Sequence, residues 1–271
     1  MSTARLTAHD RFRHWAKTMV AHHYGSGRAG EATHGARELY QSSTMGALLD
    51  GVYEGDVTIA EILHHGDFGL GTFNHLDGEM VILDGVCYHM RADGSATVAA
   101  DTERTPFAAV TRFRTDHTLA IGEPTDRADV IARIDNLIGS ENLMYAIRIR
   151  GRFSELSTRT VMGQTPPYPP LIKATEGQAE THCTDVTGTL AGFRLPDYEQ
   201  GISVAGYHLH FLDDNRTHGG HALDFHISRG DVHVCVIAEL HLSLPRTPDF
   251  LAANLASANS AEQIRQAEGG H

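Results

Sequence analysis

Residues 207–221, YHLHFLDDNRTHGGH, predict a β-hairpin that carries three candidate metal ligands. In a strand, every second side chain points to the same face. Apolar residues alternate with His208 and His210, so these two imidazoles should project side by side from one face. Turn formers follow them, and a reversal near Asn215 and Arg216 would return His221 opposite the first pair.

Three imidazoles around one point are the ligand set of a catalytic zinc site, in which a fourth position stays open. The chain holds 19 histidines among 271 residues, so chance clustering is the competing interpretation. The spacing alone leaves the two interpretations level. His218 lies near enough to the hairpin to compete with His221 as the third ligand.

The charge balance limits the partners of this chain. The 34 Asp and Glu outnumber the 22 Lys and Arg, which gives a formal net charge of -12. Nucleic acids and anionic membranes do not attract such a protein, so we expect it to bind neither. An anionic substrate would need a local cation. No apolar run reaches the length of a membrane span and no secretory signal is visible, so we expect a cytoplasmic protein.

Hydrophobic periodicity predicts mostly strands. Residues 69–99 are short apolar segments separated by three Asp-Gly pairs, which favour tight turns and indicate a β-meander. Residues 38–49 suit a helix and a strand equally, and 127–140 have the spacing of an amphipathic helix. Further strands are expected at 105–113, 144–149, 153–161, 185–195, 201–212, 222–229 and 231–244, and short helices at 174–181 and 257–268.

The run TPPYPP at 165–170 is the best candidate for a domain boundary, because proline is excluded from helix and sheet interiors. We expect a poorly ordered N-terminal extension over 1–35, a β-rich subdomain over 36–170 and a second one over 171–271. The expected fold class is α+β and strand-dominated. A mixed sheet should pack against a barrel- or sandwich-like sheet, with a few helices.

Four separate motifs resemble one known family. They are GDFGLGTFNHLDGEM at 66–80, YAIRI at 145–149, STRTV at 157–161, and GYHLHF at 206–211 with GGH at 219–221. Together they strongly resemble the α-acetolactate decarboxylases, in the right order and with compatible gaps, over about residues 42–268. Agreement among four motifs is far more specific than any one of them.

The resemblance implies a zinc enzyme that converts acetolactate, a 2-hydroxy-3-oxo acid, to acetoin and carbon dioxide. Position by position, the resemblance implies zinc ligands at His208, His210 and His221, catalytic carboxylates at Glu79 and Glu268, a substrate-contacting cation at Arg159 and a polar pocket residue at Thr72. The register of the C-terminal tail leaves Glu262 as the alternative to Glu268 for the second carboxylate.

The chemistry of acetolactate needs such a set of residues. Loss of carbon dioxide leaves an electron pair on carbon, and a Zn²⁺ chelated by the substrate ketone and hydroxyl oxygens can stabilise it as a Lewis acid. The metal then replaces an organic cofactor. A buried glutamic acid with a raised pKa can deliver the proton, and an arginine can hold the carboxylate by paired hydrogen bonds.

Without the resemblance, each of these residues has a simpler interpretation. A Glu after Asp-Gly is usually a solvated hairpin residue, an Arg on an alternating strand is usually exposed, and a terminal Glu usually frays. A zinc hydrolase and a non-catalytic metal- or ligand-binding β-barrel are the competing functions, because an open zinc site also suits water activation. We expect a homodimer, although the residues themselves do not show an oligomeric state.

Overall fold

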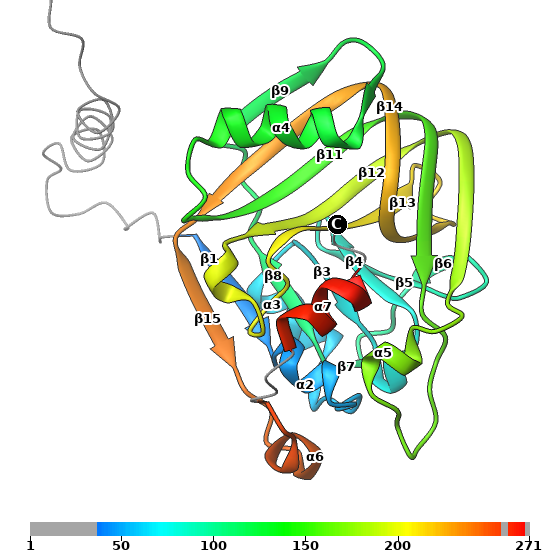
Figure 1. The fold of residues 1–271 in the computed structure, drawn as a ribbon, viewed down its shortest axis with the longest axis vertical. Coiled ribbons are helices and arrows are strands. Elements are labelled where there is room, and N and C mark those ends of the chain that lie inside the picture. The colour runs from blue at the N-terminus through cyan, green and yellow to red at the C-terminus, as the bar shows by residue number, and fades with distance from the viewer. Residues whose placement is uncertain (1–36, 256–259, 269–271) are drawn as a thin grey trace, which may run out of the picture. The chain divides into compact units, whose positions relative to one another are not determined.

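The computed structural model describes residues 37–255 and 260–268, and strands dominate this part of the chain (Figure 1). The α+β, strand-dominated fold class is therefore confirmed. The expected extension over 1–35 and the start of the predicted C-terminal helix lie outside the described residues. None of the helices in the described ranges has the length and apolar character needed to cross a membrane.

A mixed seven-stranded sheet forms one layer, in the order β15-β1-β8-β3-β4-β5-β6. Its β15 pairs with β1 in parallel, whereas the other neighbours are antiparallel. The predicted β-meander is confirmed, because β3 to β6 pair in sequence order. The strands are β1 (Glu38–Ser42), β3 (Phe68–Thr72), β4 (Glu79–Leu83), β5 (Val86–Met90), β6 (Ala96–Val98), β8 (Ala108–Thr111) and β15 (Glu239–Ser243).

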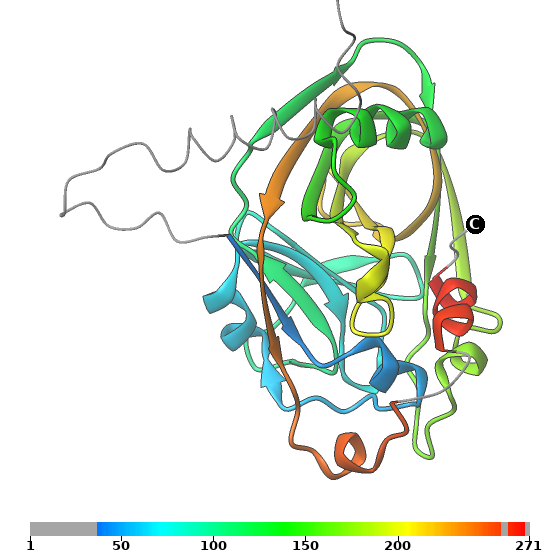
Figure 2. The same ribbon diagram turned by 60° about the vertical axis from the view of Figure 1, so that its left-hand side comes forward.

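A six-stranded sheet forms the second layer, in the order β10-β14-β11-β12-β13, with β9 paired to β14. Because β13 also pairs with β14, four long strands close into a small barrel, which Figure 2 shows as a ring. The strands are β9 (His117–Ile121), β10 (Thr125–Asp126), β11 (Met144–Thr160), β12 (Ala179–Leu195), β13 (Gly206–Asp213) and β14 (Gly219–Ile237).

Three of the four barrel strands are longer than the sequence pattern predicted, whereas β13 is shorter than the strand expected at 201–212. The segments expected as separate strands at 144–149 and 153–161 are one strand, β11, and those at 222–229 and 231–244 divide instead into β14 and β15. Gly151 lies opposite both Gly188 and Gly230. A Cβ on Gly151 would lie 2.5 Å from the Arg229 carbonyl oxygen. The glycines therefore mark a place where the strands approach closely and bend, not where they end.

Short helices and strands complete the fold. Residues 38–49 contain both candidate structures, since β1 is followed by the helix α2 (Met45–Leu49). The amphipathic helix is confirmed as α4 (Arg127–Ile138), which Asp126 caps and Gly139 ends in the left-handed conformation. The prediction of a helix at 174–181 was wrong. The remaining elements are α3 (Ile59–His65), α5 (Leu171–Ala174), α6 (Pro248–Ala252), α7 (Ser260–Glu268), the 3-10 turns η1 (Asn74–Leu76) and η2 (Asp197–Glu199), and the strand pair β2 (Val57–Thr58) and β7 (Arg104–Thr105).

The position of α5 explains this last error. The helix begins directly after Pro170 and ends at Ala174, and Gly177 then takes a positive φ of 76° before β12 starts at Ala179. Glycine adopts that conformation without the steric cost that other residues pay, so the chain leaves the helix there. The rest of the predicted helix is a loop and the start of β12.

Two apolar cores lie on opposite faces of the barrel wall. One core fills the barrel and includes Phe153, Phe211 and Phe225. The other joins the outer wall to the seven-stranded sheet, as Phe68 and Phe193 do. Alternation along β13 places Leu209 and Phe211 in the first core, so His208 and His210 face the seven-stranded sheet.

The proline run lies between β11 and β12, which are neighbours in the barrel. The barrel thus takes strands from both sides of residues 165–170, and β15 returns to the seven-stranded sheet. The division into subdomains at residue 170 stays a prediction.

Candidate functional site

The predicted hairpin brings three histidines together between the barrel and the sheet. In β13 and β14, His210 lies directly opposite His221. The candidate ligand nitrogens of His208, His210 and His221 all lie within 4.8 Å of one another. His218, the competing residue, is 70 % exposed in its side chain and contacts Asp213 instead. The hairpin geometry therefore selects His221.

The donor set suits a zinc ion, and two of the three rings lie at the spacing that zinc needs. A tetrahedral Zn²⁺ with Zn–N bonds of about 2.0–2.1 Å separates its nitrogen ligands by about 3.3 Å, and Nε2 of His208 lies 3.2 Å from Nε2 of His210. Burial lowers the pKa of both His208 and His210 to about 3. The charge of Arg159 adds to this effect for His208, and the neighbouring His208 adds to it for His210. The pKa of His221 is also lowered well below its usual value, mainly by burial. Neutral rings keep the lone pairs that a metal needs.

Backbone carbonyls orient two of these rings. Nδ1 of His210 donates to the Met80 carbonyl oxygen at 2.7 Å, which leaves Nε2 as the free ligand atom. Nε2 of His221 donates to the Glu268 carbonyl oxygen at 3.2 Å, which leaves Nδ1. Outer hydrogen bonds of this kind fix the tautomer of a metal-bound histidine. Met80 lies in β4 of the seven-stranded sheet, so that sheet helps to set the donor geometry.

Two carboxyl groups flank the histidines. Oε2 of Glu268 lies 3.6 Å from Nε2 of His208 and 3.7 Å from Nδ1 of His221. Oε2 of Glu79 lies 3.6 Å from Nε2 of His210. Burial first, and then the charge of Glu268, raises the pKa of Glu79 to about 8, while Arg159 opposes the rise. Burial likewise raises the pKa of Glu268, again against Arg159.

Arg159 is the cation of this site. It lies in β11 directly opposite His221, and its side chain is only 7 % exposed. One of its terminal nitrogens lies 3.7 Å from Oε2 of Glu268 and also donates to the Ala267 carbonyl oxygen. An acidic protein therefore keeps one buried positive charge beside the three histidines.

The C-terminal helix reaches the site because its apolar face is buried. Ile264 and Ala267 of α7 are buried in an apolar cluster with Met45 and Leu48 of α2. Glu262 instead points outward, with 73 % of its side chain exposed, and pairs with Arg265. Of the two glutamates that the sequence left open, Glu268 lies in the site and Glu262 does not.

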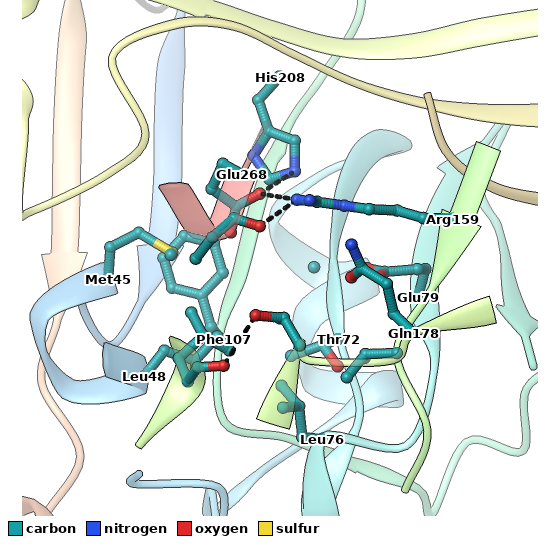
Figure 3. A pocket seen from close by; sticks show the side chains of 15 residues that line it. Met45, Leu48, Thr72, Leu76, Glu79, Phe107, Arg159, Gln178, His208 and Glu268 are labelled. Atoms are coloured by element: carbon teal, nitrogen blue, oxygen red, sulfur yellow. Dashed lines mark hydrogen bonds and ion pairs between the residues drawn. The ribbon is translucent and has the colours of Figure 1, made fainter. Parts of the chain in front are cut away.

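A pocket opens beside these groups (Figure 3). Thr72 is only 4 % exposed, and its hydroxyl donates to the Gly78 carbonyl oxygen at 2.7 Å. Gln178 also lines the pocket, and no motif predicts it because it occupies a loop. The apolar wall was likewise not predicted, and it is formed by Met45, Leu48, Leu76, Phe107, Val161 and Leu171.

Known proteins share this arrangement of the chain. A family model described as alpha-acetolactate decarboxylase matches residues 39–257. The protein with that name from Methylococcus capsulatus is 46 % identical to the chain, over 87 % of the chain and 90 % of its own length. The one from Bacillus subtilis is 44 % identical, over 86 % of the chain and 91 % of its own length. The crystal structure of the alpha-acetolactate decarboxylase from Bacillus subtilis strain 168 superimposes with a TM-score of 0.85, covering 86 % of this chain and 100 % of that one at 44 % identity.

Proposed function

We propose a zinc-dependent mechanism for this chain, which belongs to the alpha-acetolactate decarboxylase family. As a member of that family it is an acetolactate decarboxylase, a carbon–carbon lyase that serves acetoin formation. One observation carries the mechanism. Three histidines with candidate ligand nitrogens within 4.8 Å of one another stand at the edge of a pocket, and one of them, His208, lines it together with two glutamates and a buried arginine.

The ligands in this proposal are His208, His210 and His221, because their donor set and spacing fit a tetrahedral zinc ion. When bound, zinc supplies a Lewis acid that draws electron density from the substrate carbonyl. The protein supplies the orientation of the rings through the carbonyls of Met80 and Glu268. Glu268 lies close enough to two of the rings to act as a further ligand in the resting enzyme.

Arg159 binds the substrate carboxylate in this mechanism. A guanidinium offers two parallel N–H groups that match a carboxylate, and burial strengthens the charge-assisted hydrogen bonds. The carboxylate leaves as carbon dioxide, which takes no electrons from the broken bond. The electron pair stays on the substrate carbon and spreads toward the neighbouring carbonyl. Arg159 thus holds the leaving group next to the histidines.

Glu79 and Glu268 handle the protons. The raised pKa keeps Glu79 protonated near neutral pH, so this carboxylic acid can deliver a proton to the substrate carbon. Glu268 lies beside His208 and His221 and is suited to take the substrate hydroxyl proton and return it to the product oxygen. Acetoin thus gains one proton net, the one that Glu79 gives to the carbon that lost carbon dioxide.

The remaining pocket residues shape the space around the substrate. Met45, Leu48 and Phe107 offer apolar surface to the methyl groups of acetolactate and keep water away from the reacting carbon. The Thr72 hydroxyl donates to the Gly78 carbonyl oxygen, so Thr72 supports the chain just before Glu79 as well as lining the pocket.

The test is acetoin formation from racemic acetolactate by purified protein. Activity should disappear on treatment with a chelator and return on addition of Zn²⁺. His221→Ala should lose both bound zinc and activity, whereas His218→Ala, on the same hairpin but exposed, should keep both. Full activity in metal-free protein would contradict the zinc mechanism. The homodimer and the cytoplasmic location stay predictions, and sedimentation equilibrium measures the first of them.

A further inference from the structure

The turn that precedes Glu79 has an unusual backbone. Residues 73–78 connect β3 to β4, and Glu79 is the first residue of β4, paired with Thr72. His75, Leu76 and Gly78 all have positive φ angles, of 65°, 53° and 77°. Leucine and histidine rarely adopt this conformation, and it persists where the surroundings enforce it. Something must therefore hold this turn.

A buried histidine of the neighbouring strand holds both ends of the turn. His89 in β5 is 2 % exposed and pairs with Met80 in the sheet. Its Nε2 lies 2.6 Å from the Asp77 carbonyl oxygen, and since a carbonyl only accepts, Nε2 donates this hydrogen bond. Its ring stacks on Phe73 with centroids 3.8 Å apart and planes tilted by 19°. The imidazole thus contacts the first and the fifth residue of the turn.

The other ring nitrogen is held in turn by a carboxylate. Nδ1 of His89 lies 2.9 Å from Oε1 of Glu103, whose second oxygen accepts from the Ala100 backbone N–H at 2.5 Å. Because a carboxylate only accepts, Nδ1 donates to Glu103, and the guanidinium of Arg91, which lies 3.2 Å from Nδ1, does not donate to the same nitrogen. The carboxylate fixes the orientation of the imidazole, as it does for a metal-bound or catalytic histidine.

The turn also packs tightly against β5. A Cβ on Gly78 would lie 2.1 Å from the Met90 carbonyl oxygen and 3.3 Å from Nε2 of His89. The Gly78 carbonyl oxygen accepts from Thr72, and the Asp77 carbonyl oxygen accepts from His89. Both peptide groups before Glu79 are therefore clamped from different strands.

We propose that His89, oriented by Glu103, is a positioning residue that fixes the Asp77 carbonyl and through it the carboxyl group of Glu79 in the pocket. The inference rests on the proposed function, in which Glu79 transfers a proton. A displacement of about 1 Å in a reacting group can cost roughly 100-fold in rate. Removing the hydrogen bond to Asp77 should therefore lower kcat while zinc stays bound, because the three histidine ligands lie on other strands.

Two carboxamide variants separate positioning from packing. In His89→Gln the amide nitrogen lies about as far from the backbone as Nε2, so it can still donate to Asp77, whereas in His89→Asn it reaches only the place of Nδ1. We expect His89→Gln to keep most of the wild-type kcat. His89→Asn and His89→Leu should lose roughly 10-fold to 100-fold in kcat, with KM and zinc content near wild-type values. Equal kcat values for the Gln and Asn variants would overturn the inference.

The matched control is His65→Leu, because His65 is also an imidazole stacked on an aromatic ring, that of Tyr40, at 3.6 Å between centroids. It should change melting temperature more than kcat. If His89→Leu does not fold, Glu103→Ala replaces it, since that side chain is 32 % exposed. It should lower kcat in the same direction, and an unchanged kcat there would also overturn the inference.

A double-mutant cycle shows whether His89 acts through Glu79. If it does, His89→Leu should cost little further activity in a Glu79→Gln background. Full additivity of the two losses would contradict the inference. Wild-type turnover in Glu79→Gln alone would instead contradict the proposed function. A slow Glu79→Gln enzyme together with a fully active His89→Leu enzyme would reject the positioning role only.

Discussion

Arg159 combines three roles that usually belong to different residues. It opposes the rise in pKa that burial causes in Glu79 and Glu268, it bonds the C-terminal helix through the Ala267 carbonyl, and it presents a guanidinium to the pocket. Its position opposite His221 in the barrel keeps the positive charge beside the three histidines that we propose as metal ligands.

The first prediction concerns the shape of this cation. Arg159→Lys keeps the charge but loses the two-pronged hydrogen bond, so kcat/KM for acetolactate should fall by about tenfold or more, in line with a charge-assisted hydrogen bond worth about 1.5–3 kcal/mol. Arg150→Lys, an exposed position on the same strand, is the control and should change nothing. An unaltered kcat/KM in Arg159→Lys would show that Arg159 does not bind the substrate carboxylate.

Glu79 carries the second prediction at this scale. Glu79→Gln keeps the side-chain shape and removes the transferable proton, so kcat should fall by roughly 100-fold or more while zinc content stays at one per chain. Steady-state acetoin formation and metal analysis measure the two quantities. Loss of zinc together with activity would show that Glu79 supports the metal and not the proton transfer.

Among the elements, α7 is the one whose function depends most on its docking. Ile264 and Ala267 bury its apolar face against α2 and α5, and this contact places Glu268 beside the histidines. A deletion after Ala267 should leave a folded, zinc-loaded protein that loses roughly 100-fold or more in turnover, as for a removed general acid or base. Glu262→Gln, on the exposed face of α7, should keep full activity. Wild-type turnover of the truncated protein would show that Glu268 does not transfer a proton.

For the whole molecule, the proposed metal site joins its two layers. The ligands come from the barrel, whereas Met80, which orients His210, belongs to the seven-stranded sheet. A ligand that binds only the folded state stabilises it by about 2.7 kcal/mol at 100 times its Kd. Metal-free protein should therefore melt at a lower temperature than zinc-loaded protein in calorimetry. The difference should vanish in His221→Ala and persist in His218→Ala, and a zinc effect that survives in His221→Ala would place the metal elsewhere.

The sequence by itself determined the local features of this protein. The period-two alternation of apolar residues with His208 and His210, and the turn formers before His221, define a hairpin whose geometry depends on neighbouring residues only. The Asp-Gly pairs likewise define the turns of the meander, and apolar residues spaced three and four apart define the helix α4. Short-range backbone preferences decide these elements, so a pattern in the chain is sufficient to predict them.

Only the tertiary structure decided what the three histidines meet. Glu79 comes from β4, Arg159 from β11 and Glu268 from α7, and no local pattern states that these elements converge. The resemblance named the residues, but burial in the assembled pocket is what raises the carboxyl pKa values and lowers those of the histidines. The closure of the barrel and the continuity of β11 through Gly151 are equally long-range. Pairing between distant strands sets them, because the free energy of a strand depends on its neighbours more than on its own sequence.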